Sequence, residues 1–231
     1  MIAREGTPFI GIGLIVTILL LLAATRWDSR WLFGVGVLSG LLTMFTVFFF
    51  RDPERSSQRM AGILLSPADG KVINVELLPS YPGFSDKVVK VSIFLSVFDV
   101  HVNRIPADGK VEYVKYNPGK FFAAFEDKAS ALNEQTEIGI RASGQLIIVK
   151  QIAGLIARRI VCRLHDDDTV VAGARFGLIR FGSRTELFVS ASSTIGVKQG
   201  DRVRGGETVL GYLSTLERDA KSTTMQGSSH E

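Results

Sequence analysis

The stretch Lys87–Ile105, KVVKVSIFLSVFDVHVNRI, decides the fold, because its apolar side chains alternate and many of them are β-branched or aromatic. This pattern predicts one or two strands that are buried on at least one face. Asp99 and His101 stand two residues apart in it, so on a strand both side chains project from the same face. The stretch therefore predicts sheet structure and contains a candidate for chemistry.

Turns of one type flank this stretch. The sequence PADGKV occurs at Pro67–Val72 and again at Pro106–Val111. Proline fixes φ, and the Asp-Gly pair tolerates the positive φ of a tight corner, so each copy predicts a turn between strands. Apolar runs at 139–162 and 170–184 predict further strands. Residues 119–133 are the least strand-like segment, and we expect one short helix there.

The segment Gly196–Leu213, GVKQGDRVRGGETVLGYL, resembles a corner of biotinyl and lipoyl domains, in which a Gly-Asp turn and a Gly-Glu turn fold short strands over one another. Together these patterns predict a mainly β domain over residues 59–213. We expect a β-sandwich or barrel with biotinyl- or lipoyl-like features and little helix. Residues 214–231 are small and polar, which predicts a disordered tail.

Two uncharged apolar runs, at about 9–25 and 31–50, precede this domain. A bilayer core of roughly 30 Å needs about 20 helical residues, so each run is long enough to cross. The link Arg26–Arg30 is so short that the two helices must form a hairpin, which assigns residues 1–58 to a membrane anchor. A cleaved signal peptide is the alternative for the first run, but the second full-length run argues against it. A shallow interfacial hairpin also fits, because three glycines weaken the second helix.

The charges indicate an orientation and a class of partner. Arg51, Arg55 and Arg59 outnumber the two arginines of the link, so the positive-inside rule places the rest of the chain in the cytoplasm. The net charge of +4 suits a protein near anionic lipid and falls short of the basic stripe that nucleic acid requires. The single cysteine, Cys162, lies in an apolar run and is predicted to be a buried, inert thiol. The sequence leaves homo-oligomerisation open.

Few residues could carry chemistry. The chain has three histidines, of which one lies in the predicted tail. His101 stands at a strand end, where a histidine satisfied by hydrogen bonds is an equally good interpretation, and His165 precedes three aspartates, which favours a solvated turn. The chain has no His-x-His, Cys-x-x-Cys or His-Glu-x-x-His spacing, so no metal site is predicted. The remaining set is Asp69 in its turn, His101, and Ser183 after Gly182.

Five motifs, SPADGKV, FLSVFDVHVNRIPADGKV, NPGKF, NEQ and GLIRFGSR, occur in this order between Phe48 and Leu213. Each alone is weak, but the ordered set is specific, and it resembles the phosphatidylserine decarboxylase family in its short bacterial form with an N-terminal membrane hairpin. The resemblance implies a lyase of phospholipid biosynthesis at the bacterial cytoplasmic (inner) membrane. Phosphatidylserine would be its membrane-bound substrate and phosphatidylethanolamine its product.

In that family the proenzyme cuts itself between the glycine and the serine of a motif that matches Gly182-Ser183. The resemblance implies that Ser183 becomes a covalent pyruvoyl group, the only cofactor, and that a β chain (1–182) and an α chain (183–231) result. Ser183 Oγ lies next to the carbonyl of its own preceding peptide bond, so the attack is intramolecular. His101 would remove the hydroxyl proton, and Asp69 would fix the tautomer of His101, as in a serine triad.

Two positions depart from the family pattern. Longer members carry two histidines three residues apart, and here the second position is Arg104, so either His101 serves both steps or His165 supplies the base for self-cleavage. The family often has Asn-Glu-Arg where this chain has Asn-Glu-Gln, which leaves the substrate-facing role of Asn133 and Glu134 open. Two alternative functions are a pyruvoyl decarboxylase of another serine phospholipid and a membrane-tethered biotinyl or lipoyl carrier. The lack of a lysine at the hairpin tip disfavours the carrier.

Overall fold

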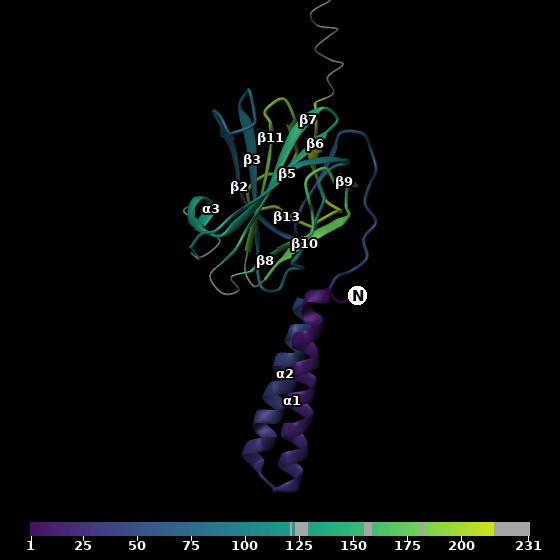
Figure 1. Ribbon diagram of the computed structural model, residues 1–231, viewed down its shortest axis with the longest axis vertical. Helices are drawn as coiled ribbons and strands as arrows, with labels where there is room; N and C mark the ends of the chain where they lie inside the picture. Colours follow the sequence, from purple (N-terminus) through teal and green to yellow (C-terminus); the bar gives the residue numbers. More distant parts are fainter. Residues whose placement is uncertain (121, 123–128, 155–158, 181–182, 215–231) are drawn as a thin grey trace, which may run out of the picture. The chain divides into compact units, whose positions relative to one another are not determined.

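The computed structural model describes residues 1–120, 122, 129–154, 159–180 and 183–214 (Figure 1). The chain divides into two compact units. One unit contains Met1–Glu54 together with Val97–Val100, and the other contains Arg55–Ser96 and the chain from His101 onward. The loop Val97–Val100, which directly precedes His101, thus belongs to the same unit as the N-terminal helices. The predicted disordered tail, apart from its first residue, lies outside the described residues.

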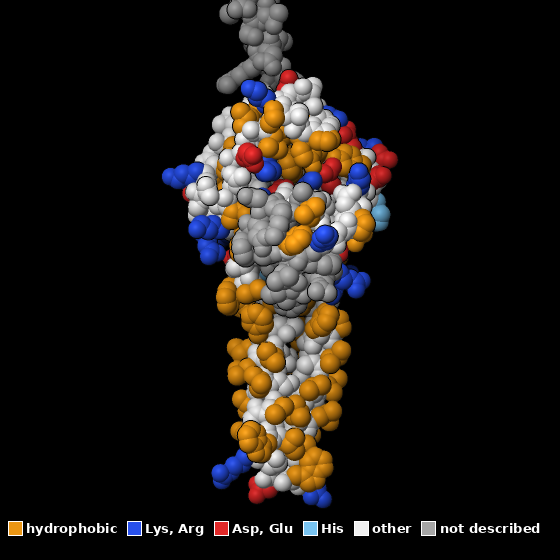
Figure 2. Space-filling view, turned by 90° about the vertical axis from the view of Figure 1, so that its left-hand side faces the viewer, with side chains coloured by type: hydrophobic (Ala, Val, Ile, Leu, Met, Phe, Trp, Pro, Cys, Tyr) orange, Lys and Arg blue, Asp and Glu red, His pale blue; other side chains and the backbone are white. Residues whose placement is uncertain are grey.

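The N-terminal unit is a helical hairpin, as the sequence predicts. A 3₁₀ turn, η1 (Arg4–Gly6), leads into α1 (Thr7–Arg26), and α2 (Arg30–Phe49) follows after a short link. Both helices are long and apolar enough to cross a membrane. Small and hydroxyl side chains let the helices approach, and Thr17 Oγ1 and Ser39 Oγ are hydrogen-bonded at 2.9 Å. Figure 2 shows hydrophobic side chains along the whole length of the hairpin on the face in view.

The second unit is mainly β, which confirms the predicted class. Its largest element is a curled, antiparallel, eight-stranded sheet that forms a half-barrel (Figure 1). The strands in spatial order are β13 (Arg202–Val203), β2 (Gly70–Leu78), β3 (Val88–Leu95), β11 (Ser183–Ser190), β7 (Gln145–Ile152), β6 (Gln135–Ala142), β5 (Gly109–Asn117) and β9 (Thr169–Val170). The only helix among the described residues of this unit is α3 (Ala129–Leu132), which lies in the segment expected to hold one short helix.

Two small antiparallel sheets complete the unit. Their strands in spatial order are β4 (Val102–Arg104), β10 (Arg175–Ile179) and β8 (Ile160–Cys162) in one, and β1 (Ile63–Leu65), β14 (Val209–Tyr212) and β12 (Thr194–Ile195) in the other. The stretch that opened the sequence analysis therefore forms two strands, β3 and β4, in different sheets. Because the chain changes sheets between β3 and β4, the residues of β3 and the residues of β4 can approach the core from different sides.

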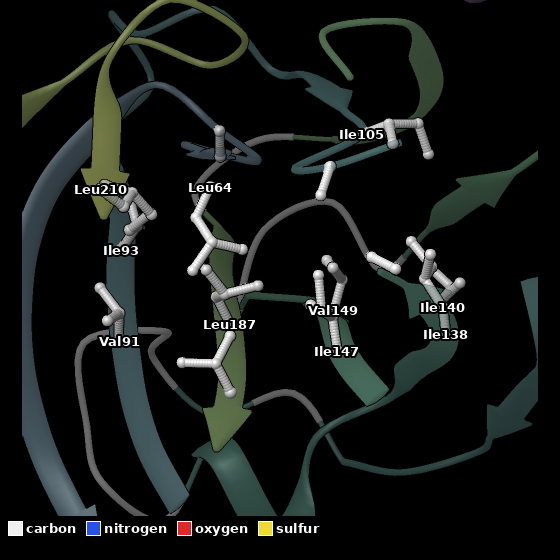
Figure 3. Close-up of a cluster of buried hydrophobic side chains, with 14 of the residues drawn as sticks. Leu64, Val91, Ile93, Ile105, Ile138, Ile140, Ile147, Val149, Leu187 and Leu210 are labelled. Atoms are coloured by element: carbon white, nitrogen blue, oxygen red, sulfur yellow. The ribbon is translucent and has the colours of Figure 1, made fainter. Parts of the chain in front are cut away.

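The main hydrophobic core lies on one face of the large sheet (Figure 3). Figure 3 shows Val91 and Ile93 of β3, Leu187 of β11, and Ile147 and Val149 of β7 in one cluster. Alternation along each strand places these side chains on a common face. On β3, β7 and β11, every second residue counted from these core residues therefore points toward the same interior.

Candidate active site

Ser183 begins β11 in the middle of the large sheet, opposite Leu95 of β3. Alternation along β11 places Ser183, Thr185 and Leu187 on the core face. Ser183 is fully buried, and its Oγ has no hydrogen-bond partner among the residues that the structure describes. A buried hydroxyl without a partner costs stability, so this position is a candidate for chemistry. Gly182, the other residue of the predicted cleavage site, lies outside the described residues.

His101 is fully buried and lies beside the end of β10. The Ile179 N–H donates a hydrogen bond to the His101 carbonyl at 3.3 Å, and Val102 then pairs with Leu178. Ile179 precedes Ser183 by only four positions in the chain. The pairing of β4 with β10 therefore places the backbone of His101 beside Ile179, four positions before Ser183.

A hydrogen bond between two further buried side chains links the same segments. Asn103 Nδ2 donates to Thr185 Oγ1 at 3.4 Å. His101 precedes Asn103 by two residues, and Ser183 precedes Thr185 by two residues. Side chains two residues apart project from the same face of an extended chain. The side chain of His101 is therefore expected on the same face as that of Asn103, and the side chain of Ser183 on the same face as that of Thr185. The contact therefore joins the segment that follows His101 to the strand that begins with Ser183.

Asp69 is held by a different set of partners from the one that the sequence predicts. Arg55 grips its carboxylate with two hydrogen bonds, Nη1 to Oδ1 at 2.5 Å and Nη2 to Oδ2 at 2.8 Å, and the Gly205 N–H donates to Oδ1 at 2.8 Å. Within the described part of the chain these are the contacts of the carboxylate, and His101 is not among them. The residue after Asp69 must be glycine, because a Cβ on Gly70 would lie 2.1 Å from the Phe94 carbonyl oxygen.

Arg104, at the second histidine position of the family pattern, is 3% exposed and faces away from Asn103 by strand alternation. Its Nη1 donates to the Gly173 carbonyl at 2.9 Å. The side chain lies so close to Gly206 that a Cβ there would approach Arg104 Cδ to 2.6 Å. Arg104 therefore connects two loops of the β domain.

His165 lies in an exposed turn, as its aspartate neighbours suggest. Its side chain is 85% exposed, and its N–H donates to Asp168 Oδ2 at 2.8 Å. The preceding strand, β8, runs antiparallel to β10, with Ile160 opposite Ile179. The chain after β8 therefore runs toward the start of β10, away from Ile179 and the end that precedes Ser183 in the sequence.

Asn133 and Glu134 lie at the base of a loop. The Asn133 side chain is buried and hydrogen-bonded to backbone groups: Oδ1 accepts from Phe122 N, and Nδ2 donates to the carbonyls of Phe122 and Ala153, each at 2.8 Å. Glu134 accepts a backbone hydrogen bond from Ala153 N and donates one to the Lys120 carbonyl. With its amide engaged in this way, Asn133 joins the backbone at Phe122 to the backbone at Ala153.

A buried charged network lies on the opposite face of β11 from Ser183. Arg184 Nη2 and Glu186 Oε1 are 2.8 Å apart, with side-chain exposures of 1% and 0%. Ser92 Oγ and Ser130 Oγ donate to the same carboxylate. The sequence analysis missed this network, although charges at positions 184 and 186 of an apolar strand were a visible signal. The network anchors α3 and β3 to the strand that begins with Ser183.

A second charged cluster, also away from Ser183, surrounds the half-buried Glu137. Burial alone would raise the pKa of Glu137, but hydrogen bonds from Tyr81 and Tyr113 and the charge of Lys150 outweigh that effect and lower it. Burial, together with the neighbouring Glu137, raises the pKa of both tyrosines. These groups join β5, β6 and β7 to the segment before β3.

Cys162 is partly buried against the core, and burial raises the pKa of its thiol, which keeps it neutral. Among the described residues, no group of three or more His, Cys, Asp and Glu side chains is arranged to hold a metal ion.

These features define a class: a β-domain protein with a buried serine and histidine, attached to an apolar helical hairpin. Comparison with known proteins identifies the family. A sequence model of the phosphatidylserine decarboxylase family matches residues 42–211. The chain is 47% identical over 212 residues to the phosphatidylserine decarboxylase proenzyme of Syntrophus aciditrophicus. The aligned region covers 91% of this chain and 96% of that protein. The proenzymes of Symbiobacterium thermophilum and Desulfotalea psychrophila are 45% and 44% identical, each covering 92% of this chain and 96% of the relative.

The chain therefore belongs to the phosphatidylserine decarboxylase family. Its activity is the decarboxylation of phosphatidylserine (EC 4.1.1.65), and its cofactor is a pyruvoyl group that the proenzyme makes from one of its own serines by self-cleavage. The expectation drawn from the five motifs is confirmed at the level of family, reaction and cofactor. The carrier interpretation was wrong. A buried serine whose Oγ lacks a partner among the described residues fits the requirement for a serine-derived group.

Proposed function

We propose that Ser183 is the serine that becomes the pyruvoyl group, and that the chain is cut between residues 182 and 183. The observation that carries this assignment is the full burial of Ser183 with an Oγ that no described residue binds. The β chain would comprise residues 1–182 and the α chain residues 183–231. Since β11 is bonded on both sides, to β3 and β7, the α chain stays in the sheet after the cut.

Self-cleavage follows from the position of Ser183. Its Oγ attacks the carbonyl carbon of residue 182, the C–N bond breaks, and the acyl group moves to oxygen as an ester. Elimination of that ester leaves dehydroalanine at position 183, and hydrolysis then releases ammonia and leaves the ketone. An intramolecular attack of this kind can equal an effective concentration of about 10⁵ M or more. A rate of about 10⁻⁴ s⁻¹, which corresponds to a barrier near 23 kcal/mol, suffices for an event that each molecule undergoes once.

His101 is the proposed base for this attack and the proposed proton carrier in turnover. Its imidazole is fully buried, and in the neutral form it can accept the hydroxyl proton. The pyruvoyl group supplies a carbonyl that withdraws electrons as carbon dioxide leaves. His101 then returns a proton to the substrate carbon, which is a task for a histidine held close to position 183.

Asp69 acts on His101 through the backbone in this proposal. Its ion pair with Arg55 and its bond from the Gly205 N–H hold the turn that contains Pro67. The Pro67 carbonyl in turn accepts hydrogen bonds from the Arg104 N–H at 2.9 Å and from Asn103 Nδ2 at 3.4 Å. Asp69 is therefore a positioning residue for the segment that follows His101.

The proposed location is the cytoplasmic face of the bacterial inner membrane, with residues 1–58 as anchor and residues 59–213 as catalytic domain. The arginines after α2 support this orientation. Arg51 donates to the Phe48 carbonyl at 2.9 Å and to the Phe98 carbonyl at 2.5 Å, so it ties the loop before His101 to the end of α2. Phe98 is 66% exposed, and an exposed aromatic ring beside a membrane helix suits the lipid interface. The loop that directly precedes His101 therefore belongs to the proposed membrane-anchoring unit.

The decisive experiment is Ser183→Ala. Wild-type protein should give two bands on a denaturing gel, and the mass of the small fragment should show a pyruvoyl group at its N-terminus, whereas Ser183→Ala should remain one inactive chain. Ser193→Ala is the matched control, because Ser193 is also buried and its Oγ has no partner among the described residues. An active wild-type chain that is never cut would contradict the proposal.

The histidines are compared in the same assay. His101→Ala should stop cleavage, and His165→Ala should leave it unchanged because that side chain is 85% exposed. Cleavage that survives the first change and fails in the second would transfer the role of base to His165.

A further inference from the structure

A second buried polar side chain on the core face close to Ser183 is Gln151 of β7. Gln151 is fully buried and stands directly opposite Thr185 in the pairing of β7 with β11. Ser183 is the next residue of β11 on the same face, which makes Gln151 its diagonal neighbour across the two strands. Diagonal neighbours lie about 7–8 Å apart, within reach of a long side chain. The carboxamide of Gln151 can therefore extend toward position 183.

The orientation of this carboxamide is determined by a chain of hydrogen bonds. The Pro67 carbonyl can only accept, so Asn103 must present its Nδ2 to it, at 3.4 Å. Asn103 then has Oδ1 available, and Gln151 Nε2 donates to it at 2.9 Å and to the Val161 carbonyl at 3.3 Å. Both partners of Nε2 are acceptors, so the amide cannot be reversed without losing both bonds.

The packing around the amide makes room for this arrangement. Gly177 of β10 lies against Gln151, and a Cβ there would approach Nε2 to 2.8 Å and the Val161 carbonyl oxygen to 2.2 Å. Any other residue at position 177 would displace the amide or the strand. The glycine thus supports a fixed direction for the carbonyl end of Gln151.

That carbonyl end is left without a donor. Gln151 Oε1 is buried and accepts no hydrogen bond from any residue that the structure describes. Ser183 Oγ is in the same condition, on the same face of the sheet. Buried acceptors are seldom left unsatisfied, and such exceptions call for an explanation such as a ligand or a bound water. Self-cleavage removes the Ser183 oxygen, so Gln151 Oε1 is the atom that indicates a place where an N–H or O–H group from outside the chain is received.

We propose that Gln151 Oε1 accepts a hydrogen bond from the amino group of the serine headgroup of the substrate; this inference rests on the proposed role of Ser183. The chemistry selects the amino group. The phosphate and the carboxylate of the headgroup are anionic acceptors, which a carbonyl oxygen repels, whereas the amino group is a donor. The amino group is also the part of the substrate that must reach position 183. Gln151 thus orients the reacting nitrogen and contributes to the choice of an amine-bearing headgroup.

The test compares two lipids that differ only in the amino group. Wild-type and Gln151→Met proteins, each carrying the full chain, are assayed on vesicles with phosphatidylserine as substrate and phosphatidyl-3-hydroxypropionate, which lacks the amino group, as competitive inhibitor. We expect Gln151→Met to cleave itself normally and to lose about 10- to 100-fold in kcat/KM, the range for a lost hydrogen bond to a charged group. The inhibition constant of the analogue should stay within about twofold of wild type.

Gln145→Met is the matched control. Gln145 begins the same strand, its Oε1 is likewise buried without a partner among the described residues, and it pairs with Ala142 at the far end of β7 from Gln151. It should retain wild-type kinetics. Gln151→Asn, which keeps the amide on a side chain shorter by one methylene, replaces the methionine variant if the latter stays uncut.

Several outcomes would overturn the inference. They are unchanged kcat/KM in a cleaved Gln151 variant, equal losses for substrate and analogue, or failure of both Gln151 variants to cleave while Gln145→Met cleaves. The last result would assign Gln151 to folding or to self-cleavage. Failure of the proposed function itself is distinct, because it would appear as an active, uncut wild-type chain.

Discussion

The ion pair between Arg184 and Glu186 gives the sharpest prediction about stability. The two charged atoms are 2.8 Å apart and the side chains are 1% and 0% exposed. Glu186→Gln keeps the shape of the side chain, but it removes the carboxylate charge that lies 2.8 Å from Arg184 Nη2 in the buried pair. Breaking one partner out of a buried pair costs about 3–5 kcal/mol.

The measurement is best made in a Ser183→Ala background, where one uncut chain gives one covalent species. For a protein of this size, 1 kcal/mol corresponds to about 2–4 °C in Tm, so Glu186→Gln should lower the Tm of the β domain by about 6–20 °C. Glu112→Gln is the matched control, because the Arg141–Glu112 pair is also close, at 2.7 Å, but its side chains are 45% and 35% exposed. Exposed pairs contribute about 0.2–1 kcal/mol.

The reasoning would be refuted if Glu186→Gln destabilised the chain no more than Glu112→Gln does. A double replacement, Arg184→Met with Glu186→Leu, separates charge from packing. Removing both charges leaves no uncompensated ion, so the double variant should be more stable than Glu186→Gln.

Three further predictions concern other regions. The pKa of Glu137 is lower in the folded state than in the unfolded chain, where it is about 4.5. The ionised carboxylate therefore stabilises the fold above pH 4.5, and this contribution disappears as the pH falls through the lower folded-state pKa. The difference in the free energy of unfolding between wild type and Glu137→Gln, measured by denaturant unfolding, should shrink over that range. Phe98→Ser should leave self-cleavage intact but reduce kcat/KM on vesicles more than on a short-chain, water-soluble phosphatidylserine, since the ring is 66% exposed on the loop that Arg51 ties to α2. Asn133→Ala should destabilise the chain by about 1–3 kcal/mol and accelerate amide exchange at Phe122, because it removes the Oδ1 that accepts from the Phe122 N–H; unchanged exchange would refute the role of this hydrogen bond.

Local sequence patterns predicted the elements of this protein well. The apolar runs at about 9–25 and 31–50 correspond to α1 (Thr7–Arg26) and α2 (Arg30–Phe49), because helix length and apolarity are properties of a continuous segment. The alternation in 87–105 predicted strands for the same reason. The pattern could not say that this stretch divides between two sheets, since strand pairing depends on partners far away in the chain.

The candidate site was predicted only in part. Ser183 and His101 emerged from a motif resemblance, and the pairing of β4 with β10 brings the His101 backbone beside the segment that leads to Ser183. The partner of Asp69 could not be predicted, because Arg55 reaches it through the fold and an arginine after a membrane helix suggests only orientation. Gln151 gave no local signal either, since one glutamine in a strand is ordinary.

The sequence by itself determined the class of each segment: an apolar hairpin long enough for a bilayer, a β domain with Pro-Ala-Asp-Gly turns, and a family resemblance that names the reaction. Those properties depend on neighbouring residues, whose chemistry is visible in one dimension. Only the tertiary structure decided which polar groups share the buried face with Ser183. The register of β7 against β11 and the direction of the Asn103 and Gln151 amides arise from contacts between residues tens of positions apart, and no local pattern records them.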